Sequence, residues 1–304
     1  MATSPGWDPD PATDSALGAL VTDLTTAGRD VIRRTPPVAP DAREGIVRRA
    51  VTRVGPAEAN LLDLLRSNHH VVSRDGTVTF STRVELPRRG MVILSATADA
   101  RVCRLLFGER VVEHLVPDVQ GVGRILQHPG SSMSRYRLTR MSPGERERFV
   151  AAVGSAPTIT YAAFKHLFEN PSELHFGNLE GRDSLGGSDV NIVGTHNLNP
   201  VSLHLMAAEL GREDTHMVGQ RRTVNSYDGY AWTDHCYADD PLLLLLQNYT
   251  RYSMLYQSIG RARALRNDCT VNVWTNLPIR GAERVEEEQE GPEGTDEAMT
   301  DGTD

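Results

Sequence analysis

The spacing of apolar residues predicts an N-terminal part that contains helices and one hairpin. Apolar positions return every three or four residues in three stretches, which predicts amphipathic helices over 16–34, 42–54 and 57–68. Residues 69–86 alternate between apolar and polar side chains around an Asp-Gly pair, a pattern typical of a β-hairpin. Residues 1–17 are rich in Pro, Asp and Ser, so we interpret them as a flexible arm.

The rest of the chain alternates between short apolar runs and helical patterns. The runs predict strands over 89–99, 121–129, 158–164, 172–178, 189–195 and 269–277. The helical patterns cover 100–108, 142–154, 200–211 and 242–265. This alternation predicts an α/β fold, in which parallel strands are buried on both faces. Ligands bind such sheets at the carboxyl ends of the strands.

Charge is distributed unevenly along the 304 residues, whose formal net charge is −8. Residues 282–304 hold ten acids and one arginine, so residues 1–281 come to about +1 (−8 + 9). This composition predicts a folded body close to neutral, followed by a disordered acidic tail. Of the 32 basic residues only Lys165 is a lysine.

Cysteine and histidine spacing predicts neither a metal site nor a disulfide framework. The three cysteines are far apart and form no CxxC pair, and the histidines lack a ligand spacing. The N-terminus shows no apolar signal segment, and the leucine run at 242–246 is too short to cross a bilayer. We therefore expect a cytoplasmic protein without a membrane partner.

Three short motifs carry the candidate chemistry. They are "LSAT" at 94–97, "IVGT" at 192–195 and "QSIGRARALR" at 257–266. Each alone has an ordinary structural interpretation, such as a strand-to-loop turn or a solvated helix face. The third is more specific, because Gln257 and Arg261 share a helix face. A glycine inside a helix costs about 1 kcal/mol relative to alanine, so Gly260 indicates that something approaches the backbone closely.

Together, and in this order, the three motifs resemble motifs III, V and VI of superfamily 2 helicases. The resemblance covers about 89–277 and is to phage-, plasmid- or archaeal-type enzymes. It implies a RecA-like P-loop NTPase-type parallel sheet with flanking helices. The implied domains are a helical N-terminal segment (1–60), a remnant of the first RecA-like domain (61–115), the second RecA-like domain (116–281) and the acidic tail (282–304).

The resemblance assigns the motif VI residues to ATP. Arg261 would be the first arginine that reaches the γ-phosphate, a role that suits a planar, permanently charged guanidinium. The second arginine is expected at position 264, where this chain has Ala264, so either Arg263 or Arg266 would serve instead. The nucleotide contacts implied are Gln257, Gly260 and Arg261, with Gln257 orienting the nucleotide or the attacking water.

Other residues are assigned to DNA, single-stranded or duplex. The resemblance implies that Ser95 and Thr97 couple the ATP and nucleic-acid sites and that Gly194 and Thr195 contact the nucleic-acid backbone. Arg221 and Arg222 add candidate phosphate contacts. The aromatic residues at 227–237 allow two interpretations, base stacking or a hairpin that packs on the sheet, and the second is favoured.

The chain lacks two motifs that the family uses to hold ATP and Mg²⁺. The phosphate loop GxxxxGK followed by Ser or Thr is absent, because the sole lysine lies in "AAFKHLF", and no DExH-like box appears. We therefore expect a helicase C-terminal module that needs a separate polypeptide with the Walker A and B motifs. Residues 61–115 would then expose apolar sheet edge unless that partner covers it. The alternatives are an ATPase-inactive nucleic-acid-binding or regulatory module, or a degenerate fragment.

Overall fold

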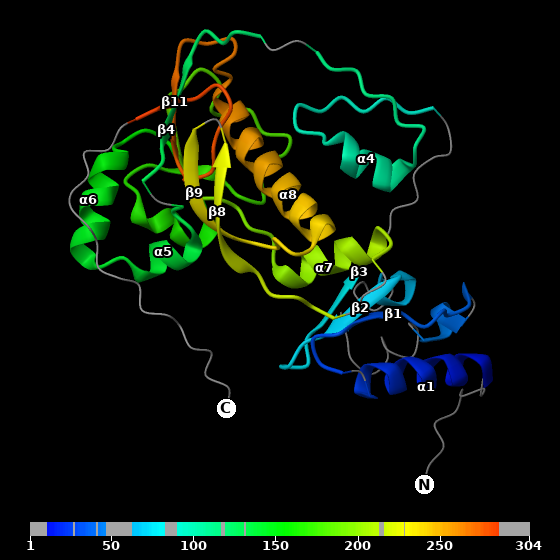
Figure 1. Cartoon of the computed structure of the whole chain (residues 1–304). Helices are drawn as coiled ribbons and strands as arrows, with labels where there is room; N and C mark the ends of the chain where they lie inside the picture. Colours follow the sequence, from blue (N-terminus) through cyan, green and yellow to red (C-terminus); the bar gives the residue numbers. More distant parts are fainter. Residues whose placement is uncertain are drawn as a thin grey trace. The chain divides into compact units, whose positions relative to one another are not determined.

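The protein folds as two compact units, seen here in a computed structural model (Figure 1). The structure describes residues 11–26, 28–40, 42–46, 63–82, 90–116, 119–130, 132–212, 216–227 and 229–285. The first unit comprises Met1–Asp118 with His196–Gln257, and the second comprises Val119–Thr195 with Ser258–Asp304. Three predicted parts fall wholly or mostly outside the described residues: positions 1–10 of the arm expected over 1–17, most of the helices expected over 42–54 and 57–68, and tail residues 286–304. The arm is wrong over 11–17, because helix α1 already begins at Pro11.

The second unit is built on a six-stranded sheet with the order β11-β4-β10-β7-β5-β6. Every pairing in it is parallel. The strands are β4 (Arg124–His128), β5 (Thr158–Thr160), β6 (Pro171–His175), β7 (Val190–Val193), β10 (Thr270–Trp274) and β11 (Glu283–Arg284). β7 is buried at all four positions, as expected of a strand covered on both faces. The predicted α/β fold with a parallel sheet and flanking helices is thus confirmed.

Helices of the second unit cover this sheet. They are α5 (Arg135–Arg140), α6 (Pro143–Val153) and the 3₁₀ turns η1 (Ala162–Leu167) and η2 (Gly260–Ala262). α6 begins with a capping box, in which Ser142 and Glu145 satisfy each other's backbone N–H groups, and it ends at Gly154. Phe149 of α6 packs edge-to-face against Trp274, with ring centroids 5.4 Å apart, and so attaches the helix to β10.

The described part of the first unit combines two small antiparallel sheets with four labelled helices and with shorter helical stretches at 42–46 and 63–66. The helices are α1 (Pro11–Thr26), α4 (Ala100–Phe107), α7 (Pro200–Glu209) and α8 (Pro241–Ile259), the last two residues of α8 falling in the second unit. The strands are β1 (Ile32–Arg34), β2 (His69–Val72), β3 (Val78–Ser81), β8 (Arg221–Tyr227) and β9 (Tyr230–Cys236). One apolar core joins Val102 of α4 to Leu203 of α7 and Leu243 of α8.

The hairpin predicted over 69–86 is confirmed by β2 and β3, whereas the helix predicted over 16–34 is wrong in its second half. The helix ends at Thr26, and Ile32–Arg34 form strand β1, which pairs with β2. Ile32 is fully buried with Val71 and Leu205, so burial of a β-branched residue in a sheet prevails over helical spacing.

The buried strand predicted over 89–99 is wrong. Residues 90–95 form no regular structure, and Val92 and Leu94 are 85% and 92% exposed. A parallel strand needs neighbours that bond its backbone and layers that cover its faces. No described residue makes a backbone hydrogen bond with Met91–Leu94, so the sheet that this pattern requires is not supplied by the described part of the chain.

The start of the acidic tail also needs correction. Glu283 and Arg284 form β11, a parallel edge strand beside β4, and the backbone N–H of Val285 donates to the carbonyl of Gln127 at 2.8 Å. The ordered chain therefore extends at least to Val285. Among the described residues, no helix has both the length and the apolar character needed to cross a membrane.

Candidate functional site

The residues that the resemblance assigns to motif VI lie at the end of α8 and in the segment between α8 and β10. Gln257 is half-buried in the last turn of α8, and Gly260–Ala262 continue as the 3₁₀ turn η2. Arg263 then adopts a left-handed conformation with φ of 57°, which ends the helix and turns the chain toward β10. The segment is thus fixed at the edge of the sheet where β10 begins.

Arg261 is held by the loop that precedes β7. Its Nη1 donates to the backbone carbonyl of Arg182 at 2.6 Å. Its Nε is buried and has no hydrogen-bond partner among the described residues. A buried donor without a partner is unfavourable, because desolvation is not compensated. The guanidinium therefore retains hydrogen-bonding capacity that the described residues do not use.

Arg263 is bound to the same loop through a carboxylate. Its Nε lies 2.9 Å from Oδ1 of Asp183, and both side chains are exposed. The hydrogen bond from Arg263 lowers the pKa of Asp183 and raises the pKa of Arg263 itself. Arg266 is exposed, and its guanidinium has no ion-pair partner in the described part of the chain. Of the two candidates for the second arginine, Arg266 is the less constrained.

The position expected for the second arginine is closed by packing. Ala264 is 8% exposed, and its carbonyl accepts a hydrogen bond from the backbone N–H of Gly123 at 2.8 Å. A Cβ at Gly123 would lie 2.3 Å from the carbonyl oxygen of Cys269, which shows that the two backbone segments are in close contact here. An arginine at 264 would have to displace that packing.

Crowding by the described residues does not explain why position 260 is a glycine. A Cβ built at Gly260 meets no described atom within 4 Å, and the residue is exposed. No residue described here makes the close approach that was inferred from the sequence. Any group that approaches this backbone comes from outside the described residues.

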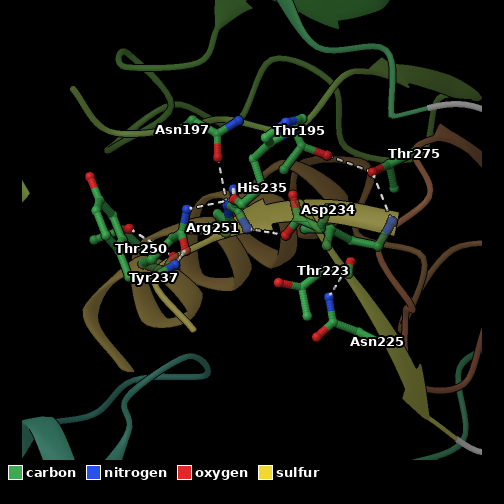
Figure 2. A network of polar contacts seen from close by, with 12 residues as sticks. Thr195, Asn197, Thr223, Asn225, Asp234, His235, Tyr237, Thr250, Arg251 and Thr275 are labelled. Carbon is green, nitrogen blue, oxygen red and sulfur yellow. Dashed lines mark hydrogen bonds and ion pairs between the residues drawn. The ribbon is translucent and has the colours of Figure 1, made fainter. Parts of the chain in front are cut away.

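Gly194 and Thr195 lie at the other edge of the same sheet, where β7 ends. Gly194 has a φ of 107°, and a Cβ there would be 2.7 Å from the ring of Tyr161 and 2.8 Å from the carbonyl oxygen of Met133. Thr195 is 4% exposed, and its hydroxyl lies 2.5 Å from that of Thr275 (Figure 2). Tyr161 donates its hydroxyl proton to the carbonyl of Thr195 at 2.6 Å.

The structure therefore separates the two predicted sites within the second unit. Because all strands are parallel, the turn after β7 lies at the carboxyl edge of the sheet, and the turn before β10 lies at the amino edge. Arg261 and Arg263 are brought together with loop residues Arg182 and Asp183. Gly194 and Thr195 are not part of that group.

Ser95 and Thr97 belong to the first unit. The backbone N–H of Thr97 donates to Oγ of Ser95 at 3.2 Å, and the carbonyl of Thr97 accepts from Ser253 of α8 at 3.4 Å. Asp99 then caps α4 by accepting from the backbone N–H of Arg101 at 2.8 Å. The loop is thus anchored at its C-terminal side, whereas the apolar residues before it are exposed.

Arg221 and Arg222 lie at the start of hairpin strand β8 and point to opposite faces. Arg221 forms an exposed ion pair with Asp239 at 2.8 Å, and Arg222 is exposed on the other face. The stacked rings of Tyr230 and Trp232, 5.9 Å apart, are half-buried on the face of Arg221. The aromatic pair thus stacks within a hairpin, which forms a separate two-stranded sheet.

A buried polar network that sequence reasoning missed connects this hairpin to α8. Arg251, only 3% exposed, donates to Asn197, to the carboxylate of Asp234 and to the carbonyl of His235 (Figure 2). Gln247, one turn earlier on α8, donates to the same carbonyl at 3.1 Å. The signal was available, because positions 243, 247, 251 and 255 share one helix face and two of them are polar.

Neither a metal-binding arrangement nor a known relative assigns a function to these residues. Within the described residues, no group of three His, Cys, Asp or Glu side chains is arranged to hold a metal ion. No family model, no curated protein and no solved structure matches this chain.

Proposed function

We propose that this chain is the C-terminal module of a superfamily 2-type helicase, with a RecA-like second unit, and that a separate polypeptide binds ATP and Mg²⁺. The module would contribute motifs III, V and VI to ATP-dependent unwinding or remodelling of DNA. The order of the three motifs supports the family, and the parallel sheet of the second unit is compatible with it.

The exposed segment Met91–Leu94 is the observation that carries the need for a partner. Its residues have strand-forming character, they precede Ser95 and Thr97 directly, and they are 45–92% exposed. Contiguous apolar exposure of this kind marks interaction surfaces. A strand supplied to the sheet of a second polypeptide would bury these side chains and bond their backbone.

The proposed role of Arg261 follows from its chemistry and its surroundings. The neutral carbonyl of Arg182 is a weaker hydrogen-bond acceptor than a phosphate oxygen. The Nε of Arg261 has no partner among the described residues and is a further donor for such an acceptor. An arginine finger increases the rate of phosphoryl transfer by roughly 10³–10⁵. We expect Arg261 to exchange the carbonyl for the γ-phosphate of ATP held by the partner.

ATP hydrolysis in the presence of single-stranded DNA tests this proposal. The full chain is assayed alone and mixed with a neighbouring gene product that carries a phosphate loop and a DExH-like box. Activity is expected only in the mixture. Binding of DNA by the chain without activity in the mixture would favour the ATPase-inactive nucleic-acid-binding module. Activity by the chain alone would contradict the proposal, because it would require a nucleotide site within this chain.

Arg261→Ala should lower the activity of the mixture by roughly 10³-fold or more, because the transition-state charge loses its guanidinium. Arg261→Lys should fail to restore it, since an ammonium does not reproduce the planar fork. Arg29→Ala, at an exposed arginine in the turn before β1, serves as the control and should leave the rate unchanged. Wild-type turnover by Arg261→Ala would remove Arg261 from the site.

A further inference from the structure

Four of the segments at the carboxyl edge of the second unit's sheet are rich in cationic side chains, although one of these, Arg137, pairs with Glu145 of α6 at 3.5 Å. The segments that follow β4, β5, β7 and β10 there are 129–142, 161–168, 194–195 and 275–282, and they contain no Asp or Glu. Their cationic side chains are Arg135, Arg137, Arg140, Lys165 and Arg280. The loop after β6, the strand farthest from β11, is not included, because it contains the acid Glu180. We call these four segments the basic edge.

Two arginines of the basic edge are not neutralised by carboxylates. Arg135 lies 5.0 Å above the ring of Tyr161, and Arg140 lies 5.2 Å from the ring of Tyr136. Both are exposed, and neither has an acidic ion-pair partner among the described residues. Tyr161 also bonds the carbonyl of Thr195, so Arg135 is fixed next to the turn assigned to nucleic acid. This turn therefore lies in a surface that attracts anions.

β11 directs the acidic tail to this same edge. Because β11 runs parallel to β4 and Val285 is bonded to Gln127, the chain leaves the sheet at its carboxyl edge. The 19 residues from 286 to 304 contain nine acids and no basic residue. A chain of that length spans at most roughly 65 Å, which is enough to reach all parts of a small sheet edge. A tether of this length gives an effective concentration on the order of millimolar.

We propose that residues 286–304 bind the basic edge of their own chain and compete there with the phosphates of DNA. The docking is inferred from the opposite charges of the tail and the basic edge, and from the position of β11, whose end lies at that edge. The identity of the competitor rests on the proposed function. The tail would then act as an intramolecular polyanion that sets a threshold for DNA binding, and added salt would weaken both interactions.

Neutralising the tail in the full chain tests the competition. In the neutral-tail variant, the nine acids at 286–304 become Gln or Asn. Its affinity for fluorescent single-stranded DNA should exceed that of the wild type at least tenfold at low salt, and the two affinities should converge as salt rises. A tail of the same composition in scrambled order should still inhibit. Equal DNA affinity of the wild type and the neutral-tail variant would overturn the competition.

A second measurement tests the docking without DNA. A labelled peptide of residues 286–304 should bind the neutral-tail variant in a salt-sensitive manner, and Arg135→Gln with Arg140→Gln should weaken this binding at least fivefold. The control removes the same charge elsewhere, through Arg29→Gln with Arg110→Gln, and should bind the peptide normally. If the peptide does not bind at low salt, the inference is wrong. Peptide binding without any DNA binding would support the docking and remove DNA contact from the proposed function.

Discussion

At the scale of single residues, the two motif glycines are required for different physical reasons. Gly194 combines a φ of 107° with ring and backbone atoms closer than 3 Å to any added Cβ. Its identity is explained by the fold alone, because an L-residue would be strained and would clash. Gly260 has open space around it, so the fold does not explain its identity. Only a group outside the described residues would distinguish glycine from alanine there.

Gly260→Ala should therefore leave the free energy of unfolding unchanged or raise it by up to about 1 kcal/mol, as alanine is the better residue in a helix. The same variant should lower ATP hydrolysis by the mixture with the partner, because the Cβ would occupy the approach to the backbone. Urea unfolding and the ATPase assay provide the two measurements. A stable variant with full activity would show that nothing approaches Gly260.

The helicase resemblance assigned a role to Arg261 and its neighbours, which stays a prediction, and it did not predict their contacts. Motif order located the arginines, whereas the bond from Arg261 to Arg182 depends on how the loop before β7 returns to the start of β10. The burial of Ala264 likewise depends on the approach of Gly123, which is distant in the sequence. Contacts of this kind are set by tertiary packing, which a local pattern does not encode.

At the scale of elements, polar contacts attach the hairpins to the helices of the first unit. Arg251 connects α8 to strand β9, and Glu209 at the end of α7 connects to β2 and β3. Helical and strand periods predicted α7, α8 and the first hairpin correctly, since each has a sustained pattern. They failed at β1 and at residues 91–94, where tertiary partners decide whether a strand forms.

Breaking the ion pair between Arg251 and Asp234 should destabilise the first unit strongly. Arg251→Met should lower the free energy of unfolding by about 3 kcal/mol, because it leaves the carboxylate of Asp234 without its buried partner. Combining it with Asp234→Leu should cost less than the sum of the two single changes, by about 1 kcal/mol or more. The matched control is the exposed pair between Arg221 of the same hairpin and Asp239 in the turn before α8, and Arg221→Met should cost less than about 1 kcal/mol. If the losses in unfolding free energy from Arg251→Met and Asp234→Leu simply add, the two side chains are not coupled.

Glu209 should make the stability of the first unit sensitive to acid. Burial alone would raise the pKa of its carboxyl group, but hydrogen bonds from Asn68, Ser81 and His69 lower it below the ordinary value of 4.5. A carboxylate whose pKa is lower when folded contributes stability above about pH 4.5 and loses it as pH falls through the folded pKa. Wild-type unfolding free energy should thus decline between roughly pH 5 and pH 3.

Glu209→Gln should be less stable than the wild type at pH 7, by about 1 kcal/mol or more, and its stability should depend less on pH in this range. Urea unfolding at a series of pH values measures both effects. Glu113→Gln, at an exposed position of the same unit, is the control and should follow the wild-type curve. If the Glu209→Gln curve is parallel to the wild-type curve, the carboxylate does not contribute through its charge.

At the scale of the whole molecule, the described part of the chain exposes contiguous apolar side chains. Besides Met91–Leu94, the segment after α4 exposes Leu115 and Val116 at 83% and 82%. The sequence analysis expected an exposed apolar sheet edge within 61–115; the structure shows exposed apolar side chains at 91–94 but no strand there.

Val92→Asp together with Leu94→Asp should reveal whether this surface is used. Since both side chains are exposed, the double variant should keep the unfolding free energy within about 0.5 kcal/mol of the wild type. It should bind less of a dye that recognises apolar surface, and it should lose activation in the mixture with the partner. Val224→Asp, at a 73% exposed valine of the hairpin, should leave activation intact. A double variant that is still activated would place the partner elsewhere.

The strand order also determines when the second unit can assemble during synthesis. Among the described strands, β4 has β10 and β11 as its neighbours, and its pairing with β10 joins Arg124 to Thr270, 146 positions later (270 − 124). Until the ribosome has passed β10, β4 has no strand to pair with, although the entire His196–Gln257 segment of the other unit has already emerged. Such long-range closure is slow and leaves strand edges available to other chains. The edges of β4 therefore stay unpaired until β10 has been made, and the last strands made are the ones that end this exposure.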